Sequence, residues 1–311
     1  MHKRAAQRVI PASLFRNLNR LAKPGKFRYN KEKEGYKMPL RLDAIMGDQS
    51  SDVLAWLLEK ELQSADDAFA TKDGRYLHIS SIFSDAKTHT PIGRYVFTLF
   101  QDKERKAMQI LDIDIVLSNA FPVCLEFVTR YEPSSDANEY YEVQTEEEHH
   151  LCVETVNRHT VPGDILGTKQ TVYVSAFPFK VSIYNDLAEL NHALGLDKRT
   201  LKIGDDEYTI GGLSDTFTAL GGVLSGEQKA EQDPWSTIVG VIHSCQEATL
   251  QFGDRACEVC IVQMKTALGL LPTIMGKERF ETDRLSPGKV ILMDACIKAN
   301  FIQDNYPKKD N

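Results

Sequence analysis

The chain has 311 residues, of which 42% are apolar and 26% charged, as expected for a folded globular protein with room for two domains. This composition excludes collagen-like, disulfide-scaffold and wholly disordered proteins, and no run of residues reaches the roughly 18 apolar residues of a membrane-spanning helix. Six cysteines in a chain of this length do not indicate a disulfide framework. The basic N-terminus is not followed by an apolar stretch, because Pro11 interrupts it directly after Val9 and Ile10, so we expect a cytoplasmic protein without a secretory signal. A transit peptide is the alternative, because residues 1–31 contain no acidic residue.

The net charge of −7 is unevenly distributed along the chain. Residues 1–41 carry twelve Lys or Arg against two acidic residues, so the remainder of the chain carries −17. Within this basic arm, Ser13 is positioned to cap a short amphipathic helix that ends before Pro24. The candidate anion-binding residues of the arm are Arg16, Arg20, Lys23, Lys26 and Arg28. The arm either binds an external anion, such as a nucleic-acid backbone or an anionic membrane, or docks on the acidic body of its own chain.

After the arm, the hydrophobic period predicts one more helix and then a series of strands. Apolar residues from Val53 to Phe69 follow helical spacing, and the helix should stop near Asp73-Gly74. Branched and aromatic residues then predict strands over 75–83, 94–100, 107–117, 123–131, 151–157, 171–176 and 179–184. A short helix is expected over 186–194, with Asp186 near its start and Gly195 at its stop. Glycine-rich residues 211–226 are expected to form a loop.

The C-terminal segment has the clearest strand pattern. Its predicted strands cover 236–247, 256–264 and 270–275, and a last strand begins at Lys289 after a polar excursion and Pro287-Gly288. This order resembles an OB-fold, a small five-stranded barrel. The segment departs from the OB-fold pattern in one respect: it has room for a fifth strand only if 289–302 bends and serves as two strands. The polar stretch before Pro234 marks a domain boundary. The expected domains are therefore a basic arm (1–41), an α+β domain (42–230), an OB-like β domain (235–303) and a polar tail (304–311).

The composition of the OB-like module does not favour nucleic-acid binding. Residues 256–275 contain no Phe, Tyr or Trp, and residues 236–303 carry seven basic and seven acidic residues. Single-stranded nucleic acids are bound by a cationic groove with aromatic stacking residues, and this module has neither feature in its sequence. The module is expected to pack or to contact protein.

Asp112 and Asp114 are the candidate metal ligands, because two residues apart on a strand they lie on one face. The alternating residues from Leu111 to Leu117 are apolar, however, so the same pattern is explained by an amphipathic strand whose polar face lies in water.

Three other motifs are better explained by structure than by chemistry. Cys257 and Cys260 have C-x-x-C spacing, but residues three apart on a strand point to opposite faces, so we expect buried thiols rather than a metal or redox site. The acidic and imidazole residues of 146–150 are expected to form a solvated loop. Gly221 and Gly226 have the separation of a phosphate-binding loop, but Glu227 stands where that loop has lysine.

The sequence therefore predicts an α+β, β-rich protein with a mixed central domain and a small OB-like β-barrel. No catalytic motif is recognisable, no cofactor is expected, and the favoured hypothesis is a non-catalytic binding or assembly protein that contacts a protein partner or itself. The alternatives are nucleic-acid association through residues 1–41 and a divalent-metal-dependent enzyme that uses Asp112 and Asp114.

Overall fold

The computed structural model describes residues 67–70, 74–102, 108–131, 139–156, 158, 161, 163–197, 199–203, 206–221, 235–252 and 254–301. Strands dominate these residues, and the one α-helix among them is α4 (Leu187–Ala193). The predicted β-rich, α+β class is therefore confirmed. The basic arm, the helix expected within it and the polar tail lie outside the described residues.

The first sheet has four antiparallel strands in the order β1-β2-β3-β4. They are β1 (Asp67–Ala70), β2 (Gly74–Ser84), β3 (Pro91–Asp102) and β4 (Met108–Leu117). The last three strands match the predicted ones. The prediction that the helix continues to Phe69 is wrong, because Phe69 lies in β1 and pairs with Tyr76 of β2. The strand pairing overrides a helical period that is ambiguous over so few residues.

The second sheet has nine strands in the order β11-β12-β13-β14-β8-β15-β7-β6-β5, with further pairings between β12 and β15 and between β8 and β5. Its strands are β5 (Pro122–Tyr131), β6 (Tyr140–Gln144), β7 (His150–Thr155), β8 (Lys169–Tyr184), β11 (Thr218–Leu220), β12 (Ser236–Phe252), β13 (Arg255–Thr266), β14 (Gly269–Gly276) and β15 (Val290–Phe301). Two of them, β6 and β11, were not predicted from the sequence. The predicted strands 171–176 and 179–184 form one strand, β8, with an irregularity in its pairing opposite Asp294/Ala295.

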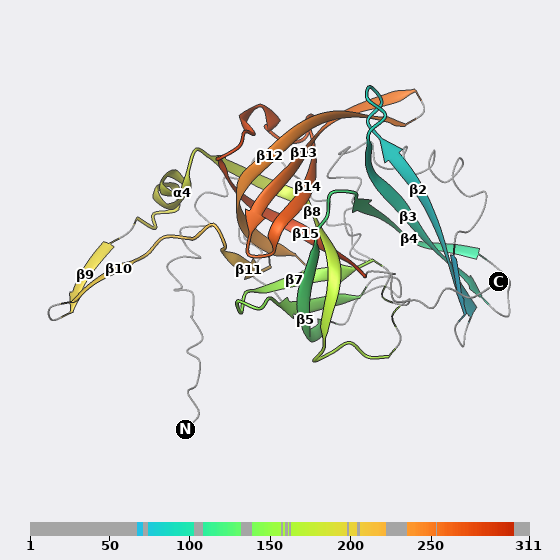
Figure 1. Ribbon diagram of the computed structural model, residues 1–311, viewed down its shortest axis with the longest axis horizontal. Helices are drawn as coiled ribbons and strands as arrows, with labels where there is room; N and C mark the ends of the chain where they lie inside the picture. The colour runs from blue at the N-terminus through green and yellow to red at the C-terminus, as the bar shows by residue number, and fades with distance from the viewer. Residues whose placement is uncertain are drawn as a thin grey trace, which may run out of the picture.

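The two further pairings turn this sheet into two rings that share β8 and β15 (Figure 1). The first ring contains β5, β6, β7, β15 and β8, and the second contains β12, β13, β14, β8 and β15. Each ring has three consecutive antiparallel strands, and the third of them runs parallel to a shared strand: β7 to β15 in the first ring, β14 to β8 in the second. The two halves of the sheet thus follow the same plan.

Residues 289–302 do not supply two strands. β15 is one continuous strand, and the strand that closes the second ring is β8, which comes from much earlier in the chain. Strands on both sides of the boundary predicted at 230–235 therefore share one sheet. The sequence pattern could show that these segments are strands, but not which distant strand completes the ring.

A continuous apolar core fills both rings. On β15, Ile297 and Ala299 belong to this core, so the intervening residue Lys298 lies on the opposite face of the strand. Other core members come from every strand of the two rings, and they include Phe127, Tyr141, Leu151, Val174, Ile238, Val262, Leu271 and Phe301. The outer faces of the rings, rather than their interiors, are thus left for polar contacts.

The four-stranded sheet is fastened to β12 of the second ring. The carboxylate of Asp85 accepts a hydrogen bond from the backbone N–H of Thr249 at 2.9 Å, and the N–H of Ala86 donates to the carbonyl of Thr249 at 2.7 Å. Beside this contact, Tyr95 stacks on Phe83 and approaches the ring of β12 residue Phe252.

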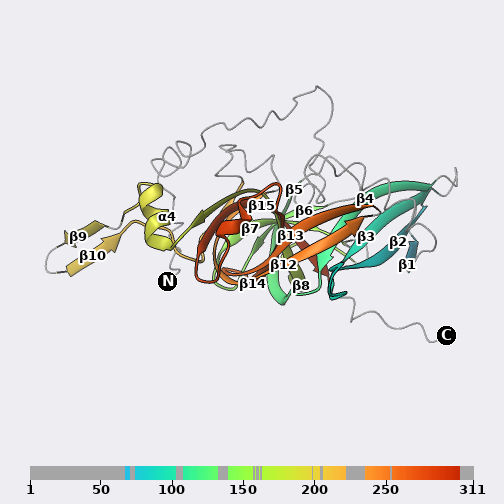
Figure 2. The same cartoon turned by 90° about the horizontal axis from the view of Figure 1, so that it is seen from above.

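Helix α4 and a two-stranded ribbon extend from the opposite end of the molecule (Figures 1 and 2). The ribbon consists of β9 (Arg199–Ile203) and β10 (Asp206–Ile210). As predicted, the Asp186 side chain caps α4 by accepting a hydrogen bond from the N–H of Glu189 at 2.8 Å. The Asn191 side chain fixes the base of the ribbon, because it accepts from the N–H of Leu213 at 2.5 Å and donates to its carbonyl at 3.3 Å.

Candidate functional site

Three ionisable side chains meet between the four-stranded sheet and the first ring. Lys298 of β15 forms ion pairs with Asp114 of β4 and with Glu154 of β7, the latter at 2.7 Å between Nζ and Oε1. Both acids are 0% exposed and Lys298 is 1% exposed. We call these three residues the buried ion cluster.

The strand register positions two members of the cluster side by side. Lys298 and Glu154 are direct partners in the parallel pairing of β15 with β7. Because Ile297 and Ala299 point into the core, Lys298 points outward, where Asp114 of the other sheet reaches it. The thiol of Cys296, two residues earlier on the same face, donates a hydrogen bond to Glu154 Oε2 at 3.0 Å. The cluster therefore joins β4, β7 and β15.

Asp114 was expected to lie on a strand face exposed to water, and this expectation is wrong. The residue is fully buried, and Ile115 and Leu117 on the opposite face are buried as well. The physical reason is that β4 is covered on both faces here, and the Lys298 ammonium compensates the buried carboxylate. The side chain of Asp112, the other candidate ligand, lies outside the described part of the structure.

Because its three side chains are buried, the cluster is better suited to hold the two sheets together than to act on a substrate that enters from solvent. Removing one partner of a buried ion pair typically costs about 3–5 kcal/mol, because an uncompensated charge is left behind. The cluster thus fixes how the four-stranded sheet sits on the first ring. Across the described ranges, no group of three or more His, Cys, Asp or Glu side chains is arranged to hold a metal ion.

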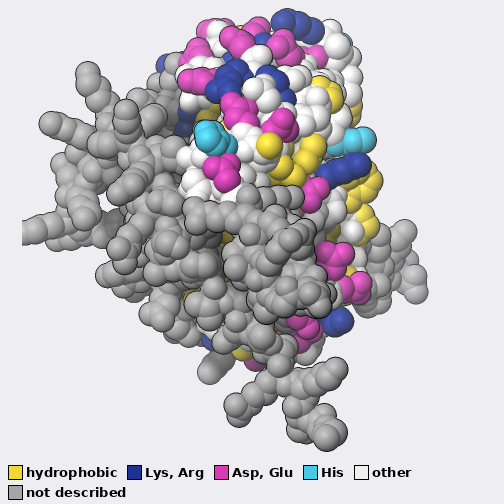
Figure 3. All heavy atoms as spheres, turned by 90° about the vertical axis from the view of Figure 1, so that its left-hand side faces the viewer, with side chains coloured by type: hydrophobic (Ala, Val, Ile, Leu, Met, Phe, Trp, Pro, Cys, Tyr) yellow, Lys and Arg dark blue, Asp and Glu magenta, His cyan; other side chains and the backbone are white. Residues whose placement is uncertain are grey.

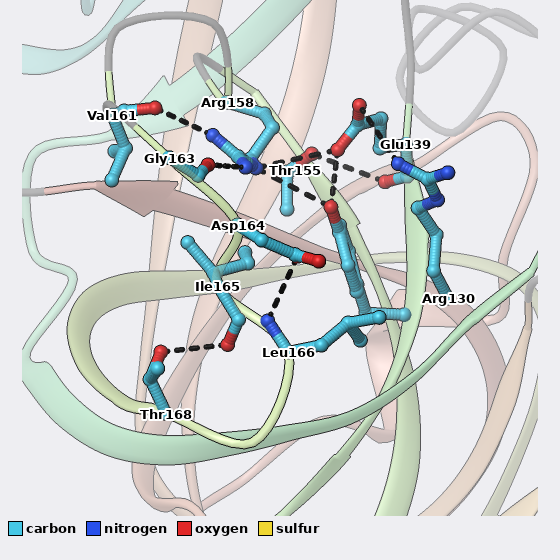
Figure 4. A network of polar contacts seen from close by, with 11 residues as sticks. Arg130, Glu139, Thr155, Arg158, Val161, Gly163, Asp164, Ile165, Leu166 and Thr168 are labelled. Atoms are coloured by element: carbon cyan, nitrogen blue, oxygen red, sulfur yellow. Dashed lines mark hydrogen bonds and ion pairs between the residues drawn. The ribbon is translucent and has the colours of Figure 1, made fainter.

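A second polar network lies at the end of the first ring (Figure 4). Arg158 donates from its guanidinium to the carbonyls of Val161, at 2.6 Å, and Gly163, and it forms an ion pair with Glu139 at 3.3 Å. Glu139 also accepts a hydrogen bond from the hydroxyl of Tyr141, whose ring lies in the core. Burial, followed by the hydrogen bond to Glu139, raises the pKa of Tyr141 to about 12. We call the contacts of Arg158 the Arg158 lock.

The other motifs considered in the sequence lie outside the buried ion cluster. Residues 146–148 form the exposed turn between β6 and β7, as expected, with His149 3.5 Å from Glu147. Next to the turn, His150 Nδ1 lies 2.7 Å from Glu142 Oε1. Cys257 and Cys260 lie on opposite faces of β13, because only Cys260 belongs to the core. The expectation of buried thiols is therefore correct for Cys260 and wrong for Cys257, which is partly exposed. Of the glycine-rich loop, residues 218–220 form β11 and residues 222–226 lie outside the described residues.

The candidate anion-binding residues Arg16, Arg20, Lys23, Lys26 and Arg28 also lie outside the described residues, so their role stays a prediction.

Lys298 and Glu154 of the buried ion cluster were not predicted from the sequence. One signal was available for Lys298, because it is the only basic residue within the apolar run of β15. A lysine inside such a run needs a buried acidic partner, but the sequence does not say which acid supplies it.

Comparison of the chain with protein-family models, with curated proteins and with solved structures found no match. No helix in the described ranges is both long enough and apolar enough to cross a bilayer.

Proposed function

We propose that this chain is a non-catalytic assembly protein that associates with a second copy of itself through protein–protein contacts. In this proposal the two rings and the sheet fastened to them are the scaffold, and the second ring is an OB-like barrel closed by β8. The buried ion cluster supports the scaffold role, because Asp114, Glu154 and Lys298 engage one another away from solvent.

The main support for self-association is the projecting ribbon of β9 and β10. It projects from the body beyond α4 in both views, and in the described part of the chain its two strands pair with each other and with no other strand (Figures 1 and 2). A two-stranded ribbon alone is marginally stable in water, and its outer edges present backbone groups that another strand can pair with. Strand addition between two copies would stabilise the ribbon and join the copies.

The described side chains near the ribbon end carry charges of both signs, which gives no surface of one sign for a partner of opposite charge (Figure 3). Figure 3 shows the face at the ribbon end of the molecule, and on its described part carboxylates and cationic side chains are interspersed. Mixed charges of this kind produce little long-range attraction at physiological salt. Nucleic-acid association through residues 1–41 and a cytoplasmic location stay predictions from the sequence.

Sedimentation velocity of the full chain over a wide concentration range tests the proposal. We expect a monomer–dimer equilibrium that disappears when a short glycine linker replaces residues 198–210. The replacement is suited to the structure, because Gly211 lies close to the carbonyl of Asp197 and the Asn191 contact to Leu213 lies outside the replaced residues.

The matched control is Ile82→Ser, which removes the most exposed large hydrophobic side chain among the described residues and should leave the equilibrium unchanged. A wild-type chain that sediments as a monomer at every concentration would refute the proposal. So would a linker variant that dimerises as the wild type does.

A further inference from the structure

Two cysteines from neighbouring strands meet at the end of the second ring. In the pairing of β12 with β13, Cys245 lies opposite Val262 and Cys260 lies opposite Glu247, so the two cysteines are diagonal neighbours on one face of the ladder. Cys260 belongs to the apolar core, and Cys245 packs against that core from a partly exposed position. Their thiols hydrogen-bond to each other.

The segment between β14 and β15 covers this thiol pair with charged and polar groups. Phe280 and Leu285 of that segment pack on the core, and Lys277 forms ion pairs with Glu247 at 2.7 Å and with Glu258 at 3.5 Å. Thr282 of the same segment is buried and hydrogen-bonds to the sulfur of Cys260.

These neighbours favour a thiolate at Cys260. The hydrogen bond from Cys245 is the largest cause that lowers the pKa of Cys260; Thr282 and the Lys277 ammonium lower it further. The same contact raises the pKa of Cys245, which therefore keeps its proton. Cys257, on the other face of β13, has a pKa raised to about 11, mainly by burial. A thiolate is the nucleophilic form of cysteine, so the two residues of the C-x-x-C spacing differ in reactivity.

We propose that Cys245 and Cys260 form a redox-active dithiol, which hydrogen peroxide converts into a disulfide between β12 and β13. The Cys260 thiolate attacks one peroxide oxygen, the O–O bond breaks, and the departing hydroxide takes up a proton to become water. Cys260 is thereby oxidised to a sulfenic acid. The Cys245 sulfur then attacks the Cys260 sulfur, the S–O bond breaks, and a second water leaves with the Cys245 proton. Two thiols lose two electrons, and one peroxide becomes two waters.

Forming the bond requires a local adjustment of the two strands. Diagonal neighbours lie about 7–8 Å apart at their Cα atoms, beyond the roughly 4.4–6.8 Å of most disulfides, so β12 and β13 must draw together at this point. A pairing irregularity lies between Ile242 and Ser244, immediately before Cys245, and such bulges let a strand bend locally. Partial exposure of Cys245 provides a route by which a molecule as small as hydrogen peroxide reaches the pair.

The test treats the full chain with hydrogen peroxide, blocks the remaining thiols by alkylation in denaturant, and maps the peptides by mass. Cleavage after Arg255 and Lys265 isolates Cys245 from a peptide that holds both Cys257 and Cys260, and further cleavage after Glu258 separates those two. We expect the chain to lose the mass of two hydrogens, to retain four of its six alkylatable thiols, and to yield a Cys245–Cys260 crosslink that dithiothreitol reverses.

Three variants assign the roles. Cys257→Ser is the matched control and should form the crosslink as the wild type does. Cys245→Ser should stop at the sulfenic acid of Cys260, which dimedone traps, and Cys260→Ser should give neither product. A wild-type chain that gains no crosslink, or one whose crosslink contains Cys257, overturns the proposal without requiring any variant to fold. The outcome is independent of whether the chain dimerises.

Discussion

The two rings have the same strand plan but different chemistry at their ends. In the first ring, the end beside β6 and β7 is held by a guanidinium that binds two carbonyls and a carboxylate. In the second ring, the end beside β12 and β13 holds two thiols under a lysine and a threonine. The shared strands and the common core specify the architecture, whereas the ends are free to differ. The same strand plan therefore tolerates quite different side chains at the ends of the two rings.

The largest expected effect follows from removing the cation of the buried ion cluster, which lies on β15, a strand of both rings. Lys298→Met removes the cation of β15 and leaves Asp114 and Glu154 buried without it, so the free energy of unfolding should fall by about 3–5 kcal/mol. Urea denaturation measures the change. The matched control is Lys265→Met on β13, whose side chain is exposed and whose replacement should change stability by less than about 0.5 kcal/mol. Equal effects of the two substitutions would show that the cluster does not stabilise the fold.

A smaller effect is expected at the end of the first ring. Arg158→Met removes the Arg158 lock and should lower the free energy of unfolding by about 1.5–3 kcal/mol, as for hydrogen bonds that involve a charged group. Arg130→Met is the control, because Arg130 is 45% exposed at its side chain and lies 4.0 Å from the same Glu139. Its replacement should cost less than about 1 kcal/mol. If Arg130→Met proves the more damaging change, the lock is misassigned.

Local signals in the sequence predict individual strands and the helix, but not the distant residues that they meet. Alternation and turn residues predicted β2 to β5 and the cap of α4 at Asp186, because those signals are local. The same reasoning placed Cys257 and Cys260 on opposite faces of β13. It did not find Cys245, Lys298 or Glu154 as partners, because the register between distant strands depends on the packed fold and not on the residues nearby.

Acid should loosen the attachment of the four-stranded sheet to the second ring. The hydrogen bond from Thr88, followed by that from the N–H of Thr249, lowers the pKa of Asp85 from 3.8 to about 2. Because the folded-state value is the lower one, the stabilisation by Asp85 is complete above about pH 4 and is lost as the pH falls toward 2.

Melting temperatures of the wild type and of Asp85→Asn measure this effect. The wild type should melt higher by a constant margin above about pH 4, and the margin should shrink as the pH falls to 2. Asp283→Asn, an exposed residue, serves as the control and should show no such margin. A margin that persists unchanged at pH 2 would mean that the charge of Asp85 does not hold the contact.

The last prediction is that a divalent cation leaves the melting temperature unchanged. It distinguishes a structural role of Asp114 from metal binding by that residue. A divalent cation that binds the folded chain alone must raise the melting temperature as its concentration increases. The Lys298 ammonium already lies where a metal ion would meet the Asp114 carboxylate, and displacing it would leave a cation buried beside the metal. Millimolar Mg²⁺ or Mn²⁺ should therefore leave the melting temperature of the wild type unchanged. A saturable increase that Asp114→Asn abolishes would instead favour the metal-dependent enzyme, and it would mean that Lys298 leaves the cluster when metal binds.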